Sequence, residues 1–157
     1  MNAYTPARSF LAANGKLAAR HLRFPRGRIG QGLVMEDGRS FTIFREIRAV
    51  LFEHPAEGAT FRVRFRVAGM SPAQNKRFSL LPIPFFAGLP GFRAKLWALD
   101  EASGEFQGLY WWATVEDAER YAHSFAMRFM TRRAVPGSVA AVVYPGLHPA
   151  LKEIQVR

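Results

Sequence analysis

The stretch GFRAKLWALDEASGEFQGLYWW, residues 91–112, decides the fold because it contains two runs of strand character joined by a polar turn. Strands near residues 92–99 and 105–113 flank the turn DEASG, an arrangement typical of a β-hairpin. Both strands carry large aromatic side chains, and the first also carries two cations. We therefore ask whether these side chains form only a core or also a ligand site.

The segment before this hairpin supplies a strand and a helix. In TFRVRFRVA, residues 60–68, apolar and arginine side chains alternate, which predicts a strand with one packed face. Ser71 is a suitable N-cap, because Pro72 fits the first helical position and Gln74 completes a capping box. This helix has to end before Pro82.

After the hairpin, Thr114 is expected to cap a single helix whose apolar stripe runs through Phe125 to Phe129. The run VAAVVY, residues 139–144, predicts a final strand. From residue 60 the order is strand, helix, strand, strand, helix, strand. This order predicts an α+β, ferredoxin-like βαββαβ fold, with an antiparallel four-stranded sheet and helices on one face.

Alternation assigns the two faces of this sheet. The apolar residues of 61–67 and of 92–98 are expected to face the helices. The helix-free face would then carry cations and an indole: Arg62, Arg64, Arg66, Arg93, Lys95 and Trp97. Since burial of one Trp side chain contributes about 2–3 kcal/mol, we expect two such sheets to pair around a shared interior, as a homodimer.

Residues 89–121, LPGFRAKLWALDEASGEFQGLYWWATVEDAERY, resemble the central motif of small mono-oxygenase-like proteins of the YdhR type. The shared pieces are PGF at 90–92, Lys95 with Trp97, Gly108 with Tyr110, and EDAE at 116–119 leading to Tyr121. The resemblance covers about residues 60–144 and implies a dimeric α+β barrel with a pocket in each subunit. Some members of that superfamily oxidise aromatic polyketides without metal or flavin, and others degrade haem.

The segment before residue 58 departs from that family pattern. We expect residues 1–57 to form a basic extension that packs on the main domain, residues 58–157. A helix over 5–22 and a hairpin formed by 33–35 and 41–52 would make up this extension. Of the net charge of +10, residues 1–66 carry +7.

Composition limits the chemistry. The chain has no cysteine, so disulfides, thiolate metal sites and a cysteine nucleophile are excluded. No stretch is long and apolar enough to suggest a membrane span, and no signal peptide is evident, so we expect a cytoplasmic protein. His21, His54 and His148 are isolated from further ligands, so neither a metal nor a cofactor is expected.

The first functional hypothesis is a cofactor-independent mono-oxygenase-like enzyme that acts on a small hydrophobic or aromatic compound. Lys95 and Arg93 would polarise the substrate and stabilise its carbanion or enolate, so that the substrate itself reduces oxygen. Tyr110 could donate a hydrogen bond or a proton. The residues expected to line or close the pocket are Arg64, Trp97, Trp112, Phe85 and Phe86. Which of residues 110–112 face the pocket stays open.

Several alternatives stay open beside it. The arginines could face solvent while the tryptophans fill a dimer core. A non-enzymatic module could bind a small apolar molecule or lipid, with residues 1–30 touching an anionic membrane surface. Haem binding or degradation would need a ligand such as His123, but we expect a surface pair between His123 and Glu119 instead. No specific nucleic-acid motif accompanies the basic charge.

Overall fold

The structure is a computed structural model that describes residues 7, 11, 22–50 and 58–152. The helix expected over 5–22 lies almost wholly outside these residues. The described elements are β1 (Leu22–Arg23), β2 (Gly32–Val34), β3 (Ser40–Ala49), β4 (Ala59–Arg66), α2 (Pro72–Phe78), α3 (Ile83–Phe86), β5 (Phe92–Asp100), β6 (Glu105–Trp112), α4 (Val115–Ala122), α5 (Phe125–Thr131), β7 (Ala140–Pro145) and α6 (Pro149–Lys152).

The strands form one antiparallel sheet in the order β1-β3-β5-β6-β4-β7, and β2 pairs with β3. From β4 onward, the order β5-β6-β4-β7 with intervening helices is that of the split βαβ arrangement. The expected α+β ferredoxin-like fold is therefore confirmed. The expected hairpin within the basic extension is also present, as β2 and β3. Because β3 pairs with β5, this hairpin widens the ferredoxin-like sheet by one strand.

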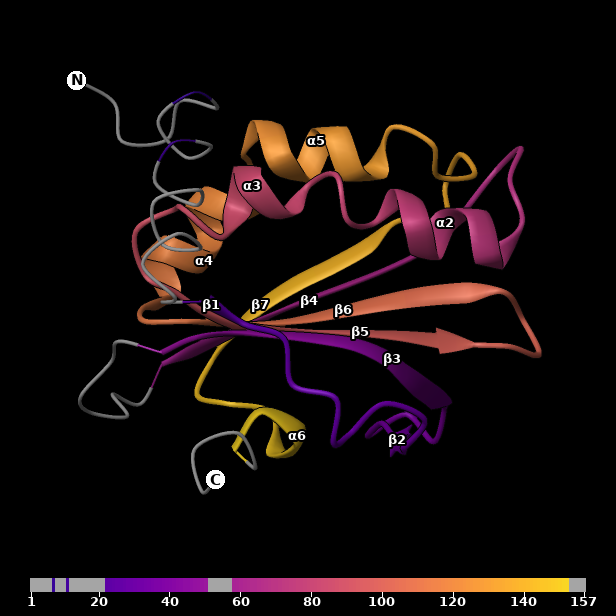
Figure 1. Ribbon diagram of the computed structural model, residues 1–157, viewed down its shortest axis with the longest axis horizontal. Helices are drawn as coiled ribbons and strands as arrows, with labels where there is room; N and C mark the ends of the chain where they lie inside the picture. The colour runs from indigo at the N-terminus through magenta and orange to yellow at the C-terminus, as the bar shows by residue number, and fades with distance from the viewer. Residues whose placement is uncertain (1–6, 8–10, 12–21, 51–57, 153–157) are drawn as a thin grey trace.

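The sheet is covered on both faces by the chain itself (Figure 1). Helices α2 to α5 lie on one face, whereas the β2 hairpin and α6 lie on the other. Two apolar clusters correspond to these layers, and the cluster under the hairpin contains Phe41, Leu96, Leu109, Trp111 and Leu151. A second copy is therefore not needed to hide the part of the face that this cluster occupies, contrary to our expectation.

Two helix predictions have different outcomes. The capping box at Ser71 is present, since its side chain accepts from the Gln74 backbone N–H while the Gln74 side chain accepts from the Ser71 N–H. The single helix expected after Thr114 is wrong. It breaks at His123, and Ser124 caps a second helix by accepting from the backbone N–H of Met127.

A β-bulge at Arg93 reverses the expected faces of β5. Phe92 pairs with Trp112, but Ala94 already pairs with the adjacent Trp111, so one residue of β5 is extra. Beyond this point the side chains change sides, and Lys95 lies toward the helices. The predicted faces are therefore correct for β4 and wrong for β5 after Phe92.

Candidate active site

The amine of Lys95 is buried among aromatic rings between the sheet and the helices. Its Nζ atom lies 4.2 Å from the ring centroid of Trp97, 4.3 Å from that of Tyr110 and 4.8 Å from that of Phe86. The side chains come from β5, β6 and α3, and Lys95 is only 1% exposed. Such contacts stabilise an ammonium electrostatically, although burial away from water opposes its charge.

Gly108 makes room for this enclosure. It pairs with Trp97 across the two strands, on the same face of the sheet as Lys95 and Tyr110. A Cβ atom at this position would lie 2.9 Å from a ring carbon of Tyr110 and 3.4 Å from Cε of Lys95. A side chain here would therefore force the ring of Tyr110 to move, which explains locally why the strand carries glycine.

Hydrogen bonds lead from α4 to a sulfur atom next to the amine. The hydroxyl of Tyr121 donates to the hydroxyl of Tyr110 over 2.8 Å. Tyr110 in turn donates to Sδ of Met130 over 3.4 Å, and Nζ of Lys95 approaches the same sulfur at 3.8 Å. Because a thioether is a weak acceptor, both donors remain able to exchange it for a better partner.

Burial moves both titratable groups toward their neutral forms. Loss of water, and secondarily the positive charge of Arg45, lowers the pKa of Lys95 well below its ordinary value. Loss of water, followed by the neighbouring Tyr121, raises the pKa of Tyr110 well above its ordinary value. Burial therefore favours a free amine, which can accept a proton, next to a phenol, which can donate one.

Arg45 reaches this region from β3. A second bulge, between Ile43 and Arg45, places the guanidinium on the helix side, where Cζ lies 5.5 Å from the Trp97 ring centroid. Its nitrogens donate to Oγ of Ser79 and, over 2.9 Å, to the carbonyl of Lys76 at the end of α2. Partial burial lowers the pKa of Arg45 from its very high ordinary value, and the guanidinium stays charged.

A small cavity of about 20 Å³ adjoins the amine. This volume accommodates about one water molecule. Aromatic side chains and Met130 form most of its wall, and Asn75 and Ser79 of the α2 region add polar groups. Asn75 is 6% exposed, so its amide is held at the cavity rather than in bulk water. The full lining is Phe65, Asn75, Phe78, Ser79, Pro82, Lys95, Trp97, Phe106, Gln107, Gly108 and Met130.

The predicted site residues divide into two groups. The structure brings Lys95, Trp97, Tyr110, Trp112 and Phe86 into one cluster on the helix side. Three others lie elsewhere, and none of them lines the cavity. These are Phe85, which packs between α3 and α5 against Phe125 and Phe129, Arg93 at the bulge, and Arg64 on the opposite face.

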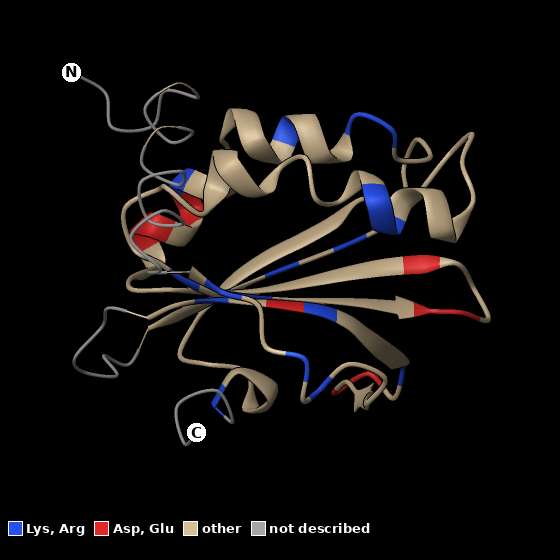
Figure 2. Cartoon of the chain, viewed as in Figure 1, with Lys and Arg blue, Asp and Glu red and all other residues tan. Residues whose placement is uncertain are grey.

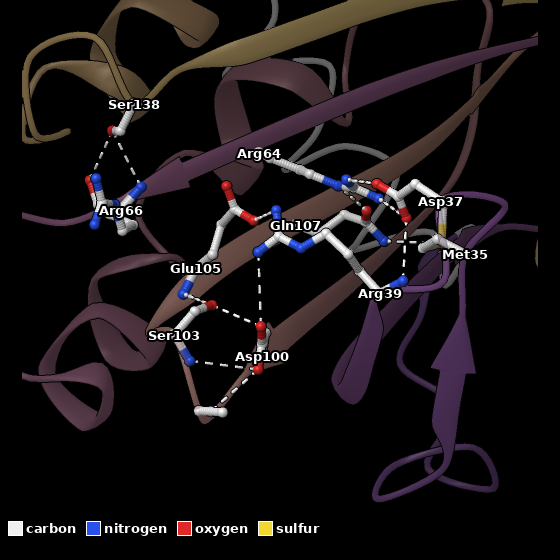
Figure 3. A network of polar contacts seen from close by, with 11 residues as sticks. Met35, Asp37, Arg39, Arg64, Arg66, Asp100, Ser103, Glu105, Gln107 and Ser138 are labelled. Carbon is white, nitrogen blue, oxygen red and sulfur yellow. Dashed lines mark hydrogen bonds and ion pairs between the residues drawn. The ribbon is translucent and has the colours of Figure 1, made fainter.

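Arg64 belongs to a polar network under the hairpin, which Figure 3 shows. Its Nε donates to the Gln107 side chain over 2.7 Å, and its guanidinium forms an ion pair with Asp37 in the β2–β3 turn. Its Cζ also lies 5.0 Å from the Phe41 ring centroid. Arg64 therefore fastens the hairpin to the sheet rather than facing Lys95.

Four residues at the site were missed by the sequence analysis: Arg45, Asn75, Tyr121 and Met130. Tyr121 and Met130 could only be read as helix core residues, because an apolar stripe does not reveal which member points at a lysine. Asn75 carried a usable signal, since a polar side chain on the buried side of a capped helix needs an explanation. Arg45 carried none, because its position depends on a long-range strand pair and a bulge.

A larger hollow, of about 760 Å³, lies on the opposite face and is open to solvent. It runs between the β2 hairpin and the segment before α6, and its polar lining includes Arg28, Glu36, Tyr144 and His148. Nε2 of His148 lies 3.5 Å from Glu36, and burial lowers the pKa of His148. No predicted site residue lines this hollow.

No family model matches the sequence, and no curated protein matches it. Among solved structures, a regulator of staphylococcal pathogenesis has a TM-score of 0.55 at 8% identity, over 88% of this chain and 93% of its own. The haem-degrading enzyme LmHde from Listeria monocytogenes has a TM-score of 0.54 at 9% identity, over 85% and 92%. An uncharacterised ferredoxin-fold protein from Listeria monocytogenes, related to antibiotic biosynthesis monooxygenases, has a TM-score of 0.52 at 11% identity, over 74% and 69%.

These similarities define the class of this chain, a ferredoxin-like α+β protein. The chain shares this fold with a protein related to antibiotic biosynthesis monooxygenases. The named functions differ from one neighbour to the next, so function has to be argued from the site. The narrower resemblance to the YdhR type stays a prediction. His123 is 84% exposed and lies 3.9 Å from Glu119, which confirms the expected surface pair. None of the described helices is long and apolar enough to cross a membrane.

Proposed function

We propose that this protein is a mono-oxygenase-like enzyme that works without a cofactor on a small aromatic compound with an acidic carbon-bound hydrogen. The observation that carries the proposal is the buried amine of Lys95, which lies 4.3 Å from the ring centroid of Tyr110 and shares the Sδ atom of Met130 with the Tyr110 hydroxyl. Among the residues that the structure describes, no carboxylate pairs with this amine. The lowered pKa of Lys95 favours its uncharged amine, which can accept a proton from a bound ligand.

In the proposed reaction, Lys95 takes a proton from a methylene carbon of the substrate, and the carbanion left behind adds to dioxygen. The resulting peroxide anion takes up a proton, from Lys95 or through Tyr110, and the hydroperoxide then loses water. The methylene becomes a carbonyl, so one substrate and one O₂ give one ketone and one H₂O. The substrate supplies every electron, which is why the protein has only to move protons and stabilise an anion.

Access requires movement, because the cavity as it stands holds about one water molecule. Phe78 at the end of α2, and Ser79 and Pro82 between α2 and α3, contribute to its wall. An aromatic ring can enter only if this wall moves outward. The bonds from Arg45 to Ser79 and Lys76 are the polar contacts that hold it to the sheet.

Oxygen uptake tests the function. The protein is mixed with a panel of aromatic compounds that carry an activated methylene, and dissolved oxygen is followed with an electrode. We expect Lys95→Met to reduce uptake at least a hundredfold and Tyr110→Phe to reduce it less, in line with typical losses of general acid–base groups. Arg77→Gln, an exposed change on α2, is the control. No uptake by any compound, or equal uptake by Lys95→Met, would overturn the proposal.

We also propose a homodimer, with β7 rather than the face beneath the hairpin at its centre. β7 is the last strand of the sheet, and Val142 on it and Val139 beside it are exposed. An apolar edge strand without charged residues favours pairing with another strand. Sedimentation should give a dimer mass for the full chain, and Val142→Lys should shift it toward the monomer. A monomer at all concentrations would refute this arrangement.

A further inference from the structure

Two basic side chains, the amine of Lys95 and the guanidinium of Arg45, share the site, and the described part of the chain provides neither with an acidic partner. Lys95 is bounded by aromatic rings and a sulfur, and Arg45 by Ser79, a backbone carbonyl and the ring of Trp97. Both side chains contact Trp97, Nζ at 4.2 Å and Cζ at 5.5 Å from the ring centroid. They are close enough for Arg45 to make protonation of Lys95 less favourable.

The helices that cover the cavity also lack acidic residues. Figure 2 shows basic residues on α2 and α5, and the sequences of α2 (PAQNKRF), α3 (IPFF) and α5 (FAMRFMT) contain no Asp or Glu. The acidic residues of the helix layer lie on α4, at its N-terminal turns. Lys76 of α2 adds a further cation, 5.3 Å from the Phe44 ring centroid. The described helices α2 and α5 therefore carry basic residues, and α2, α3 and α5 contain no acidic residue that would compensate them.

We propose that the site holds an aromatic oxyanion, and that Arg45 is the residue that selects it. The ligand enters as a neutral phenol or enol, gives its proton to Lys95, and stays as the anion beside Lys95 and Arg45. Buried cations attract an anion far more strongly than exposed ones, because little water screens them. Proton transfer gives Lys95 a partner for its charge, which the protein alone does not provide.

Arg45 acts here as a specificity and positioning residue. It lies on β3, outside the βαββαβ core, so the strand that widens the sheet also supplies charge to the site. Its guanidinium donates a hydrogen bond to the hydroxyl of Ser79, whose side chain lines the cavity. The inference rests on the proposed function for the location of the site, but it is a statement about binding and needs no turnover.

The test uses 4-nitrophenol, whose ionised form is yellow and whose neutral form is not. The protein in excess is titrated with acid and base, and the absorbance gives the acid dissociation constant of the bound phenol. For the unaltered protein we expect that constant to be roughly tenfold or more larger than in water. Nitrobenzene, which has no proton to lose, is the neutral comparison and should bind with the same affinity to every Arg45 variant.

The variants separate charge from folding. Arg45→Gln should remove most of the increase in the dissociation constant, whereas Arg45→Lys should keep much of it. Arg77→Gln, which removes an exposed cation from the same helix layer, should change nothing. If Arg45→Gln weakens nitrobenzene binding as much as nitrophenol binding, Arg45 acts only as a fastener of α2 and the inference is overturned.

The two proposals fail separately. Ionisation of bound 4-nitrophenol without oxygen uptake from any methylene compound would support the oxyanion site and overturn the oxygenase. Oxygen uptake by a protein in which 4-nitrophenol ionises as it does in water would support the oxygenase and overturn the oxyanion site.

Discussion

The amine of Lys95 and the hydroxyl of Tyr110 share one acceptor, the Sδ atom of Met130, at 3.8 Å and 3.4 Å. Burial lowers the pKa of Lys95 and raises the pKa of Tyr110, so it favours a free amine and an undissociated hydroxyl at the same sulfur. A thioether competes weakly for hydrogens. Both groups are therefore available to a ligand that offers an oxygen.

The first prediction concerns stability and pH. Replacing Lys95 by Met should raise the free energy of unfolding at neutral pH by about 1 kcal/mol or more, because a buried amine loses favourable hydration and Met does not. The unfolded chain binds a proton at Lys95 that the folded chain does not. Stability of the unaltered protein should therefore rise with pH between the lowered pKa of Lys95 and its ordinary value of 10.5.

Urea unfolding at a series of pH values measures both effects. The difference between the two proteins should be largest at neutral pH and should shrink toward pH 10. If the Lys95→Met protein is less stable than the unaltered protein at every pH, the amine is charged and is stabilised by the surrounding aromatic rings.

A second prediction concerns the wall of the enclosure. Phe86→Ala removes a fully buried ring 4.8 Å from Nζ of Lys95, which should cost about 3–5 kcal/mol of stability. Water that enters the space should also raise the pKa of Lys95 toward its ordinary value. Labelling of amines at several pH values, followed by peptide mass spectrometry, would report this pKa.

Phe85→Ala is the matched control, because Phe85 contacts Phe125 and Phe129 and does not line the cavity. It should lower stability without changing the labelling of Lys95. Equal labelling profiles for both variants would show that Phe86 does not control the hydration of the site.

The third prediction concerns Gly91, at the start of β5. Its φ is +83°, and an added Cβ would lie 2.2 Å from an oxygen of the Asp117 side chain. Gly91→Ala should therefore lose more stability than the strain of a positive φ alone, which is on the order of 1–2 kcal/mol. Gly30→Ala is the control, since Gly30 has φ of +88° and no atom near that position. Chemical denaturation of the two variants should differ, and equal losses would contradict the clash.

The fourth prediction concerns the opposite face. The hydrogen bond from Arg64 is the largest cause that lowers the pKa of Asp37 to about 2, against an ordinary value of 3.8. The pair therefore contributes stability above pH 3.8 that disappears as the pH falls toward 2. Arg64→Gln should flatten the pH dependence of unfolding in that window and leave 4-nitrophenol ionisation unchanged. If bound 4-nitrophenol no longer ionises in this variant, Arg64 does contribute to the ligand site, as the sequence analysis expected.

The element order was predictable because local signals agree with it. Strict alternation in residues 60–68 and the capping box at Ser71 each depend on a few neighbouring residues, and both are present in the structure. Ser124 was also a readable N-cap, so the break between α4 and α5 could have been expected. The bulges at Phe44 and Arg93 could not have been expected, because the position of a bulge depends on the pairing with the neighbouring strand and is not visible in the local sequence.

For the site, residue types were more predictable than positions. A lysine among large aromatics in one hairpin indicated a cation–aromatic cluster, and Lys95, Trp97 and Tyr110 do lie together. Alternation alone predicted that this cluster lies on the helix-free face, between two subunits. Because of the bulge, the cluster instead lies beneath the helices of a single subunit. Arg45 needed the pairing of β3 with β5, which joins parts of the chain about fifty residues apart.

The extra residue in β5 also bears on descent and alignment. Deletion of one residue at Arg93 would turn the amine of Lys95 away from its aromatic neighbours and toward the hairpin. Nearly every other residue of the strand would stay the same. Homologues that differ by that one insertion would look alike on paper yet present opposite surfaces to any small molecule. Matching them column by column through this segment would equate groups that never occupy the same space.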